Sequence, residues 1–223
     1  MIIIINTFLI IFFVTIIVIF VTYNIRVDKD IYFLLKETKI KDDDVDTSIS
    51  IMENKIKTAT NEVIDLLYNK SYEDIQQTLS LRDSENKNIF SYTVILTALF
   101  SVFYIFTKIT FNSVYKDLFI QLLFCLSFSS FSLIISTAAY FKALSFQYEL
   151  PRDTASLIDC DIKTIKANTI AVNAVGAQNN QEANRNKIHA CKIAKKYIKI
   201  CLLFYFVFGL TIFLYRFFST FNN

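Results

Sequence analysis

The sequence predicts an all-α integral membrane protein with about four transmembrane helices and helical cytoplasmic segments. Four long stretches contain almost no charged residue, although charged residues make up 19% of the chain. Hydrophobic residues make up 54% of its 223 residues. Only 2 glycines and 1 proline are present, so residues that normally end helices are scarce and long helices are expected.

The four apolar stretches predict the transmembrane helices. They cover residues 2–23, 89–107, 118–146 and 197–218. A helix needs about 20 residues to cross about 30 Å of hydrocarbon, and each stretch is near or above that length. No basic residue precedes the first stretch and no cleavage site of small residues follows it, so we expect a retained anchor rather than a signal peptide.

The distribution of lysine and arginine predicts the topology. The short connection at 108–117 carries only Lys108 and Lys116, whereas the polar segments 24–88 and 147–196 hold most of the other basic residues. Positive residues are retained in the cytoplasm. We therefore expect a multi-pass protein of the cell inner membrane, with both long segments cytoplasmic and both termini outside.

Both polar segments carry apolar residues at helical spacing. Steps of three and four join Ile49, Met52, Ile56, Ala59, Val63 and Leu66, and a second stripe joins Ile158, Ile162, Ile165, Thr169 and Val172. These coiled-coil-like stripes could pack on each other within the chain or pair between protomers. They could also bind a regulatory partner, for which the candidate positions are Ile49, Met52, Ile56, Val63, Ile158, Ile162 and Ile165.

The second polar segment contains two further features. Residues 174–186 are rich in Asn, Gln and Ala, which makes them the best candidate for a flexible or partner-reading element. Beyond them, the apolar stripe returns at Ile188 and continues into the last apolar stretch without a helix breaker. We therefore expect one helix to run from the polar segment into the membrane.

Small and hydroxyl-bearing residues mark one face of two predicted spans. They are Thr93, Thr97 and Ser101 in the second span and Ser129, Ser132, Ser136 and Ala139 in the third. Such faces allow membrane helices to approach closely and to share hydrogen bonds. Alternatively, in a homo-oligomer, the serine face could line a path for water.

Several classes of function are disfavoured. No Asp, Glu, Arg or His lies near the centre of any apolar stretch, whereas pumps and ion-coupled transporters place ionisable groups there. A single histidine and 4 cysteines without a C-x-x-C pair predict no metal site. We expect no cofactor, no enzymatic activity and no direct binding of nucleic acid. The acidic run Asp42, Asp43, Asp44 and Asp46 could be a solvated face or could complement the basic end of the second polar segment.

This layout of a few spans, helical cytoplasmic segments and no catalytic motif resembles that of small transmembrane effectors of bacterial antiphage systems. These include retron-associated membrane effectors and SLATT-type effectors. The resemblance implies a cytoplasmic regulatory partner, either a reverse transcriptase–RNA/DNA complex or a nucleotide-signalling enzyme. It also implies that release from this partner lets the protein permeabilise or depolarise the inner membrane, so that an infected cell dies. A protective membrane protein, as in colicin immunity or superinfection exclusion, and a membrane scaffold or signalling subunit are the alternatives.

Overall fold

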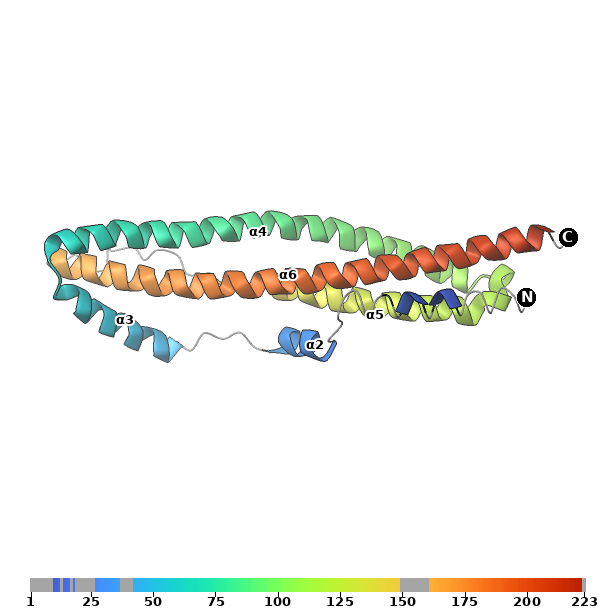
Figure 1. Ribbon diagram of the computed structural model, residues 1–223, viewed down its shortest axis with the longest axis horizontal. Helices are drawn as coiled ribbons and strands as arrows, with labels where there is room; N and C mark the ends of the chain where they lie inside the picture. Colours follow the sequence, from blue (N-terminus) through green and yellow to red (C-terminus); the bar gives the residue numbers. More distant parts are fainter. Residues whose placement is uncertain are drawn as a thin grey trace. The chain divides into compact units, whose positions relative to one another are not determined.

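The computed structural model describes residues 10–12, 14–16, 18, 27–36, 42–148 and 161–221, and all of their regular structure is helical. The elements are α2 (Val27–Leu35), α3 (Asp42–Lys57), α4 (Asn61–Thr110), the 3₁₀ helix η1 (Ser113–Leu118), α5 (Phe119–Leu144) and α6 (Ile162–Phe221) (Figure 1). The predicted all-α class is confirmed. Most of the first apolar stretch, 2–23, lies outside the described residues, and so does Ile158.

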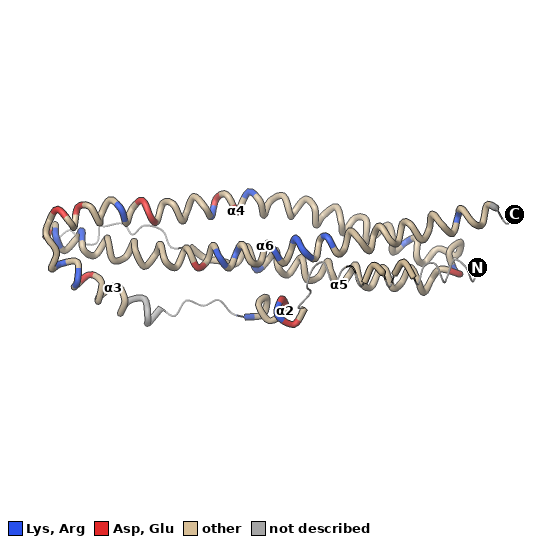
Figure 2. Tube along the Cα trace, in the orientation of Figure 1, with Lys and Arg blue, Asp and Glu red and all other residues tan. Residues whose placement is uncertain are grey.

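The chain divides into two compact units. The apolar unit comprises Met1–Lys36, Ile89–Lys142 and Ala190–Asn223, and the polar unit comprises Glu37–Asn88 and Ala143–His189. Helices α4 and α6 each contribute to both units. Charged residues are numerous in α3 and in the first part of α4, whereas α5 is almost free of them (Figure 2).

Among the described residues, three helical segments are long and apolar enough to cross a membrane: Asn61–Thr110, Ser113–Leu144 and Ile162–Thr220. Each contains an interval without any charged side chain, between Lys87 and Lys108, between Asp117 and Lys142, and between Lys199 and Arg216. The helix expected to run unbroken from the second polar segment into the last span is confirmed as α6. Helix α4 is continuous in the same way because it contains neither glycine nor proline.

In the apolar unit, α4 and α6 lie side by side and run in the same direction (Figure 1). The Tyr205 hydroxyl donates a hydrogen bond to the Leu99 carbonyl oxygen over 2.9 Å. The rings of Phe106 and Phe208 are stacked, with centroids 4.0 Å apart. Two parallel helices pack side by side over many turns only if the difference in sequence number between facing residues stays constant.

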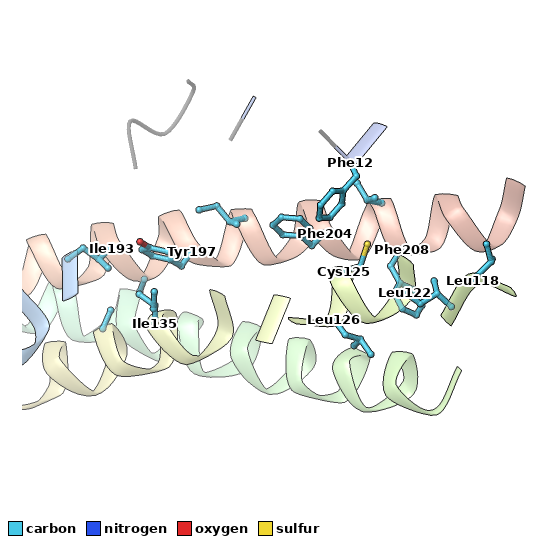
Figure 3. Packing of buried hydrophobic residues seen from close by; sticks show 14 of the residues in the cluster. Phe12, Leu118, Leu122, Cys125, Leu126, Ile135, Ile193, Tyr197, Phe204 and Phe208 are labelled. Carbon is cyan, nitrogen blue, oxygen red and sulfur yellow. The ribbon is translucent and has the colours of Figure 1, made fainter. Parts of the chain in front are cut away.

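Helix α5 runs antiparallel to α4 and α6 because η1 reverses the chain. The Asn112 side chain caps η1 by accepting a hydrogen bond from the Val114 amide. At one end of α5, Leu122 and Cys125 lie near Phe204 and Phe208, whereas Ile135 lies near Tyr197 further along (Figure 3). Phe12, from the first apolar stretch, contacts the rings of Phe124, Phe128 and Phe204.

In the polar unit, the two segments predicted to carry the stripes pack on each other within the chain, but α6 does so through other residues than the predicted stripe, whose Ile162 is 72% exposed. The buried cluster contains Ile56 and Ile64 from the first segment and Ala167, Ile170 and Ala171 from α6, with Ile49 and Met52 packed against it. The predicted continuous stripe from Ile49 to Leu66 is wrong in its second half. The chain turns at residues 58–60 between α3 and α4, so Val63 and Leu66 are 45% and 69% exposed while Ile64 is 1% exposed.

One repeat of 3.5 residues orders the buried face of α4 and of α6. Positions alternately four and three apart are buried or half-buried in α4: Ile64, Tyr68, Ser71, Ile75, Thr78, Arg82, Glu85, Ile89, Tyr92, Leu96, Leu99, Phe103, Phe106 and Thr110. The same holds in α6 for Lys166, Ile170, Asn173, Ala177, Asn180, Asn184, Lys187, Cys191, Ala194, Ile198, Cys201, Tyr205, Phe208, Ile212 and Tyr215. A 3.5-residue repeat is the pattern of helices that pack along a seam, and it is present within each of the two units.

Truncation of a seam residue in the polar unit should loosen it measurably. Replacing the buried Ile75 by alanine leaves a cavity, which costs about 3 kcal/mol and raises the rate of local opening roughly a hundredfold. Hydrogen exchange of residues 61–88, measured by mass spectrometry on the full chain in detergent, should show this increase. The control Leu66→Ala lies on the exposed side of the same helix and should change opening by less than about 0.5 kcal/mol. Equal effects of both variants would contradict the seam.

Candidate functional site

The serine face of α5 is buried inside the apolar unit. Ser129, Ser132 and Ser136 are 0%, 2% and 0% exposed, and Ala139 is fully buried beside them. Each serine hydroxyl donates to a carbonyl oxygen three or four residues earlier in the same helix, at 2.9 Å. In this conformation the face therefore allows close packing of α5, and each serine hydroxyl already donates its proton to a carbonyl oxygen of the same helix.

The small residues of α4 do not all share that environment. The Thr93 hydroxyl shares a 2.6 Å hydrogen bond with the Tyr140 hydroxyl of α5. Thr97 and Ser101 are exposed instead, and their hydroxyls donate to the carbonyl oxygens of Thr93 and Thr97. The structure thus brings only Thr93 to α5 and places Thr97 and Ser101 away from the serine face.

Gln121 extends the serine face by two helical turns toward η1. It follows the same spacing, since Gln121, Cys125, Ser129, Ser132 and Ser136 are four, four, three and four residues apart. The side chain is buried, and among the described residues its Oε1 atom has no hydrogen-bond donor. A buried acceptor without a donor costs about 1–3 kcal/mol, so this end of the face is not optimised for the packed conformation.

A buried ion pair fixes α2 to the apolar unit. The Lys196 ammonium lies 2.5 Å from Asp30 Oδ2, and the two side chains are only 18% and 12% exposed. The Tyr197 hydroxyl donates to the same carboxylate oxygen over 3.2 Å. At the other end of α2, the Lys142 ammonium donates to the Lys36 carbonyl oxygen. We call this arrangement of Asp30, Lys196, Tyr197 and Lys142 the α2 clamp.

The sequence analysis missed the α2 clamp. Its partners are 166 and 106 residues apart, so no local spacing connects them. The available signal was the short amphipathic run at 27–35, in which Val27, Phe33 and Leu34 pack against the buried cluster and Asp30 shares their side of the helix. A buried carboxylate on such a helix requires a cationic partner.

The polar unit contains a buried polar layer. The Asn184 amide nitrogen donates to the Thr78 carbonyl oxygen over 3.0 Å, and its amide oxygen accepts from the Tyr148 hydroxyl over 2.8 Å. The Lys187 ammonium donates to the Asn86 amide oxygen. Arg82 and Lys187 both lie over the Tyr148 ring, at 5.7 and 5.4 Å from its centroid. Residues 174–186 are therefore a helical part of this unit, and Asn180 and Asn184 within it are buried.

The candidate partner-binding residues fall into three groups. Ile56 is buried, and Ile49, Met52 and Ile165 are half-buried. Val63 and Ile162 are exposed, Ile162 by 72%. Ile158 lies outside the described residues. Among the described candidates, Val63 and Ile162 are the most accessible to a partner in this conformation, and partner binding at them stays a prediction.

Ionic contacts join α3 and α4 to α6 within the polar unit. Glu53 accepts hydrogen bonds from the Lys57 ammonium at 2.6 Å and from the Asn168 amide at 2.9 Å. These two contacts, Lys57 first, lower the pKa of the Glu53 carboxyl. Asp65 and the Lys166 ammonium are 2.5 Å apart. The side chains of the acidic run at Asp42–Asp46 lie outside the described residues, and its proposed complementarity with the basic end of the second polar segment stays a prediction.

The described residues contain no group of three or more His, Cys, Asp or Glu side chains that could hold a metal ion. No protein-family model, no curated protein and no solved structure matches this chain. The candidate sites must therefore be judged on their geometry.

Breaking the α2 clamp should release α2. In Asp30→Asn the Lys196 ammonium loses its counter-charge in a site that is mostly buried, which should cost about 2 kcal/mol of docking free energy. Hydrogen exchange of residues 27–36 in the full chain should accelerate accordingly. Asp28→Asn, on the exposed side of α2, is the control and should have little effect.

Removal of both charges separates the ion pair from the packing of α2. The double variant Asp30→Asn with Lys196→Met leaves no unpaired charge and should exchange more slowly than Asp30→Asn alone. If Asp30→Asn and Asp28→Asn exchanged equally fast, the ion pair would not be what holds α2.

The docking of α3 should depend on pH through Glu53. Because its pKa is lowered on folding, the Glu53 contacts stabilise α3 fully above the ordinary value of 4.5 and are lost as the pH falls through the lowered value. Hydrogen exchange of residues 47–57, corrected for intrinsic rates, should accelerate between about pH 5 and about pH 3. Glu53→Gln should weaken this dependence, whereas Glu62→Gln, exposed at the start of α4, should leave it unchanged. An unaltered pH profile in Glu53→Gln would exclude Glu53 as its source.

Proposed function

We propose that this protein is a membrane-perturbing effector of an antiphage defence system and that the structure corresponds to its resting state. It acts in abortive infection, by permeabilising or depolarising the inner membrane when a cytoplasmic partner releases it. In this proposal four helices cross the membrane, the first being the stretch at 2–23, and both long polar segments face the cytoplasm. The partner is a reverse transcriptase–nucleic acid complex or a nucleotide-signalling enzyme.

The single observation that carries the proposal is the buried serine face of α5. Small residues alone are enough for close packing in lipid, whereas this face also aligns the larger amide side chain of Gln121 with Ser129, Ser132 and Ser136. Buried against the neighbouring helices, the face cannot contact water. Turned toward a second copy, it would supply hydroxyl and amide groups to a path for water and ions.

The unsatisfied Gln121 oxygen supports a second conformation. Its cost in the packed state, about 1–3 kcal/mol, would be recovered where water or another copy donates a hydrogen bond. A difference of a few kcal/mol is the range in which a partner can shift an equilibrium between two conformations. In the resting conformation, the cost of the Gln121 oxygen would therefore favour a rearrangement at the same face that would line the path.

The α2 clamp supplies a place where the partner could act. Helix α2 is the first described element after the first apolar stretch, and it is held by the Lys196–Asp30 ion pair, the Tyr197–Asp30 hydrogen bond and the Lys142–Lys36 hydrogen bond. A partner that binds α3 and keeps α2 docked would hold the apolar unit closed. Once that partner leaves, undocking of α2 exposes the Val27, Phe33 and Leu34 side and frees α5 and α6 to repack.

The proposal is tested by inducing the chain alone in bacteria while a voltage-sensitive dye reports the membrane potential, with and without phage challenge. The wild type should depolarise the membrane and reduce viability, and phage challenge should accelerate both effects if the host supplies the partner. Ser129→Ala with Ser132→Ala and Ser136→Ala removes the hydroxyls with little change in volume, so depolarisation should fall severalfold. Thr97→Ala with Ser101→Ala is the matched control on the exposed side of α4 and should behave as the wild type.

Each other result has a defined meaning. An unchanged potential under both conditions, with better survival after challenge by one phage or colicin, would replace the proposal with a protective membrane protein. An unchanged potential without protection would favour a scaffold or signalling subunit. Equal depolarisation by the serine and threonine variants would show that the serine face does not line the path. All variants must be compared at equal amounts in the membrane fraction.

A further inference from the structure

Four lysines lie in two turns of α6 just before its interval without charged residues, and they differ in burial and in ion pairing. Lys196 is half-buried and paired with Asp30. Lys192, Lys195 and Lys199 are exposed, and among the described residues no carboxylate lies within ion-pair distance of their ammonium groups. We call these three residues the lysine stripe, part of the charged stretch near the middle of α6 (Figure 2).

The lysine stripe continues directly into an exposed apolar stripe. With steps of three and four, the same face of α6 carries Leu202 and Phe206, then Gly209, Phe213 and Phe217. Leu202, Phe206, Phe213 and Phe217 are all exposed large hydrophobic side chains. One face of a single helix thus changes from cationic to apolar within one turn, between Lys199 and Leu202.

The dimensions of this face match the hydrocarbon core of a lipid bilayer and one of its two surfaces. From Lys199 to Arg216 the helix rises about 26 Å without a charged residue, close to the roughly 30 Å of a hydrocarbon core. From Lys192 to Lys199 it rises about 10 Å, which a layer of headgroups and the reach of flexible lysine side chains can cover. The apolar part contacts acyl chains while the stripe meets the headgroups above them.

We propose that the lysine stripe is a binding surface for anionic phospholipid headgroups, with the acyl chains lying along Leu202 and Phe206. Exposed ammonium groups at the end of a membrane helix have phosphate as the matching partner at that depth. Each lysine near an anionic surface contributes about a fivefold gain in affinity. The stripe therefore favours phosphatidylglycerol or cardiolipin over zwitterionic lipid, and this selectivity does not depend on the proposed effector function.

The test uses the full chain reconstituted in phosphatidylcholine bilayers with trace spin-labelled phosphatidylglycerol or phosphatidylcholine. Electron spin resonance gives the relative affinity of the two lipids for the protein surface. The wild type should prefer phosphatidylglycerol severalfold. Lys192→Gln with Lys195→Gln and Lys199→Gln should reduce that preference at least about fivefold or abolish it. The control Lys55→Gln with Lys70→Gln and Lys163→Gln removes the same charge from the polar unit and should retain it.

Two further arms identify the ligand. About 0.5 M sodium chloride should weaken the preference, because exposed charges are screened over a few ångströms at that ionic strength. Inorganic phosphate at the same ionic strength should weaken it no more than chloride does. Displacement by phosphate beyond the chloride effect would mean a site for free phosphate and would overturn the lipid assignment. So would an equal preference in the stripe and control variants, or no preference in the wild type.

Discussion

The parallel pairing of α4 and α6 is the constraint on which the other contacts depend. Side-chain hydrogen bonds between the two helices link residues 101 to 106 positions apart in sequence, both in the polar unit and in the apolar unit. Parallel helices keep such a difference constant, whereas antiparallel helices would not. The same 3.5-residue repeat orders both units, although the polar unit is rich in charged residues and the apolar unit has the composition of a membrane domain.

What stabilises the pairing must differ between the two units. In the polar unit, burial of Ile64, Ile75 and Ile170 removes apolar surface from water. In lipid that driving force is absent, and close packing with hydrogen bonds takes its place. The stacked rings of Phe106 and Phe208 and the Tyr205–Leu99 hydrogen bond are contacts of that second kind. The polar layer around Asn184 has another effect, since a shift of register would leave its amide unpaired in the interior.

The sequence was sufficient to predict the helical class and the apolar intervals, because both follow from composition along the chain. It was not sufficient to predict the shared seam. In the apolar intervals every face of the helix is hydrophobic, so periodicity cannot distinguish the side that faces a neighbour. In the polar unit the buried face of α4 includes Thr78, Arg82 and Glu85, which the sequence alone suggests are solvent-exposed. The structure shows instead that Thr78 accepts hydrogen bonds from Asn180 and Asn184 of α6. The turn at residues 58–60 was also not predicted, because the four-residue step from Ala59 to Val63 is the spacing expected within one continuous helix.

The Lys196 ammonium belongs to the α2 clamp and lies beside the lysine stripe, so Asp30 and the proposed lipid surface would compete for it. At 100° per residue, Lys196 lies about 40° around the helix from Lys192, so it borders the exposed stripe and reaches Asp30 only by turning inward. If α2 undocks, the Lys196 ammonium can turn back toward the headgroups and add a fourth cation to the proposed lipid surface. The Asp30 carboxylate and an anionic headgroup are then alternative partners for the same ammonium. A membrane rich in anionic lipid should consequently favour the undocked state of α2, which couples the conformation of the apolar unit to the lipid around α6.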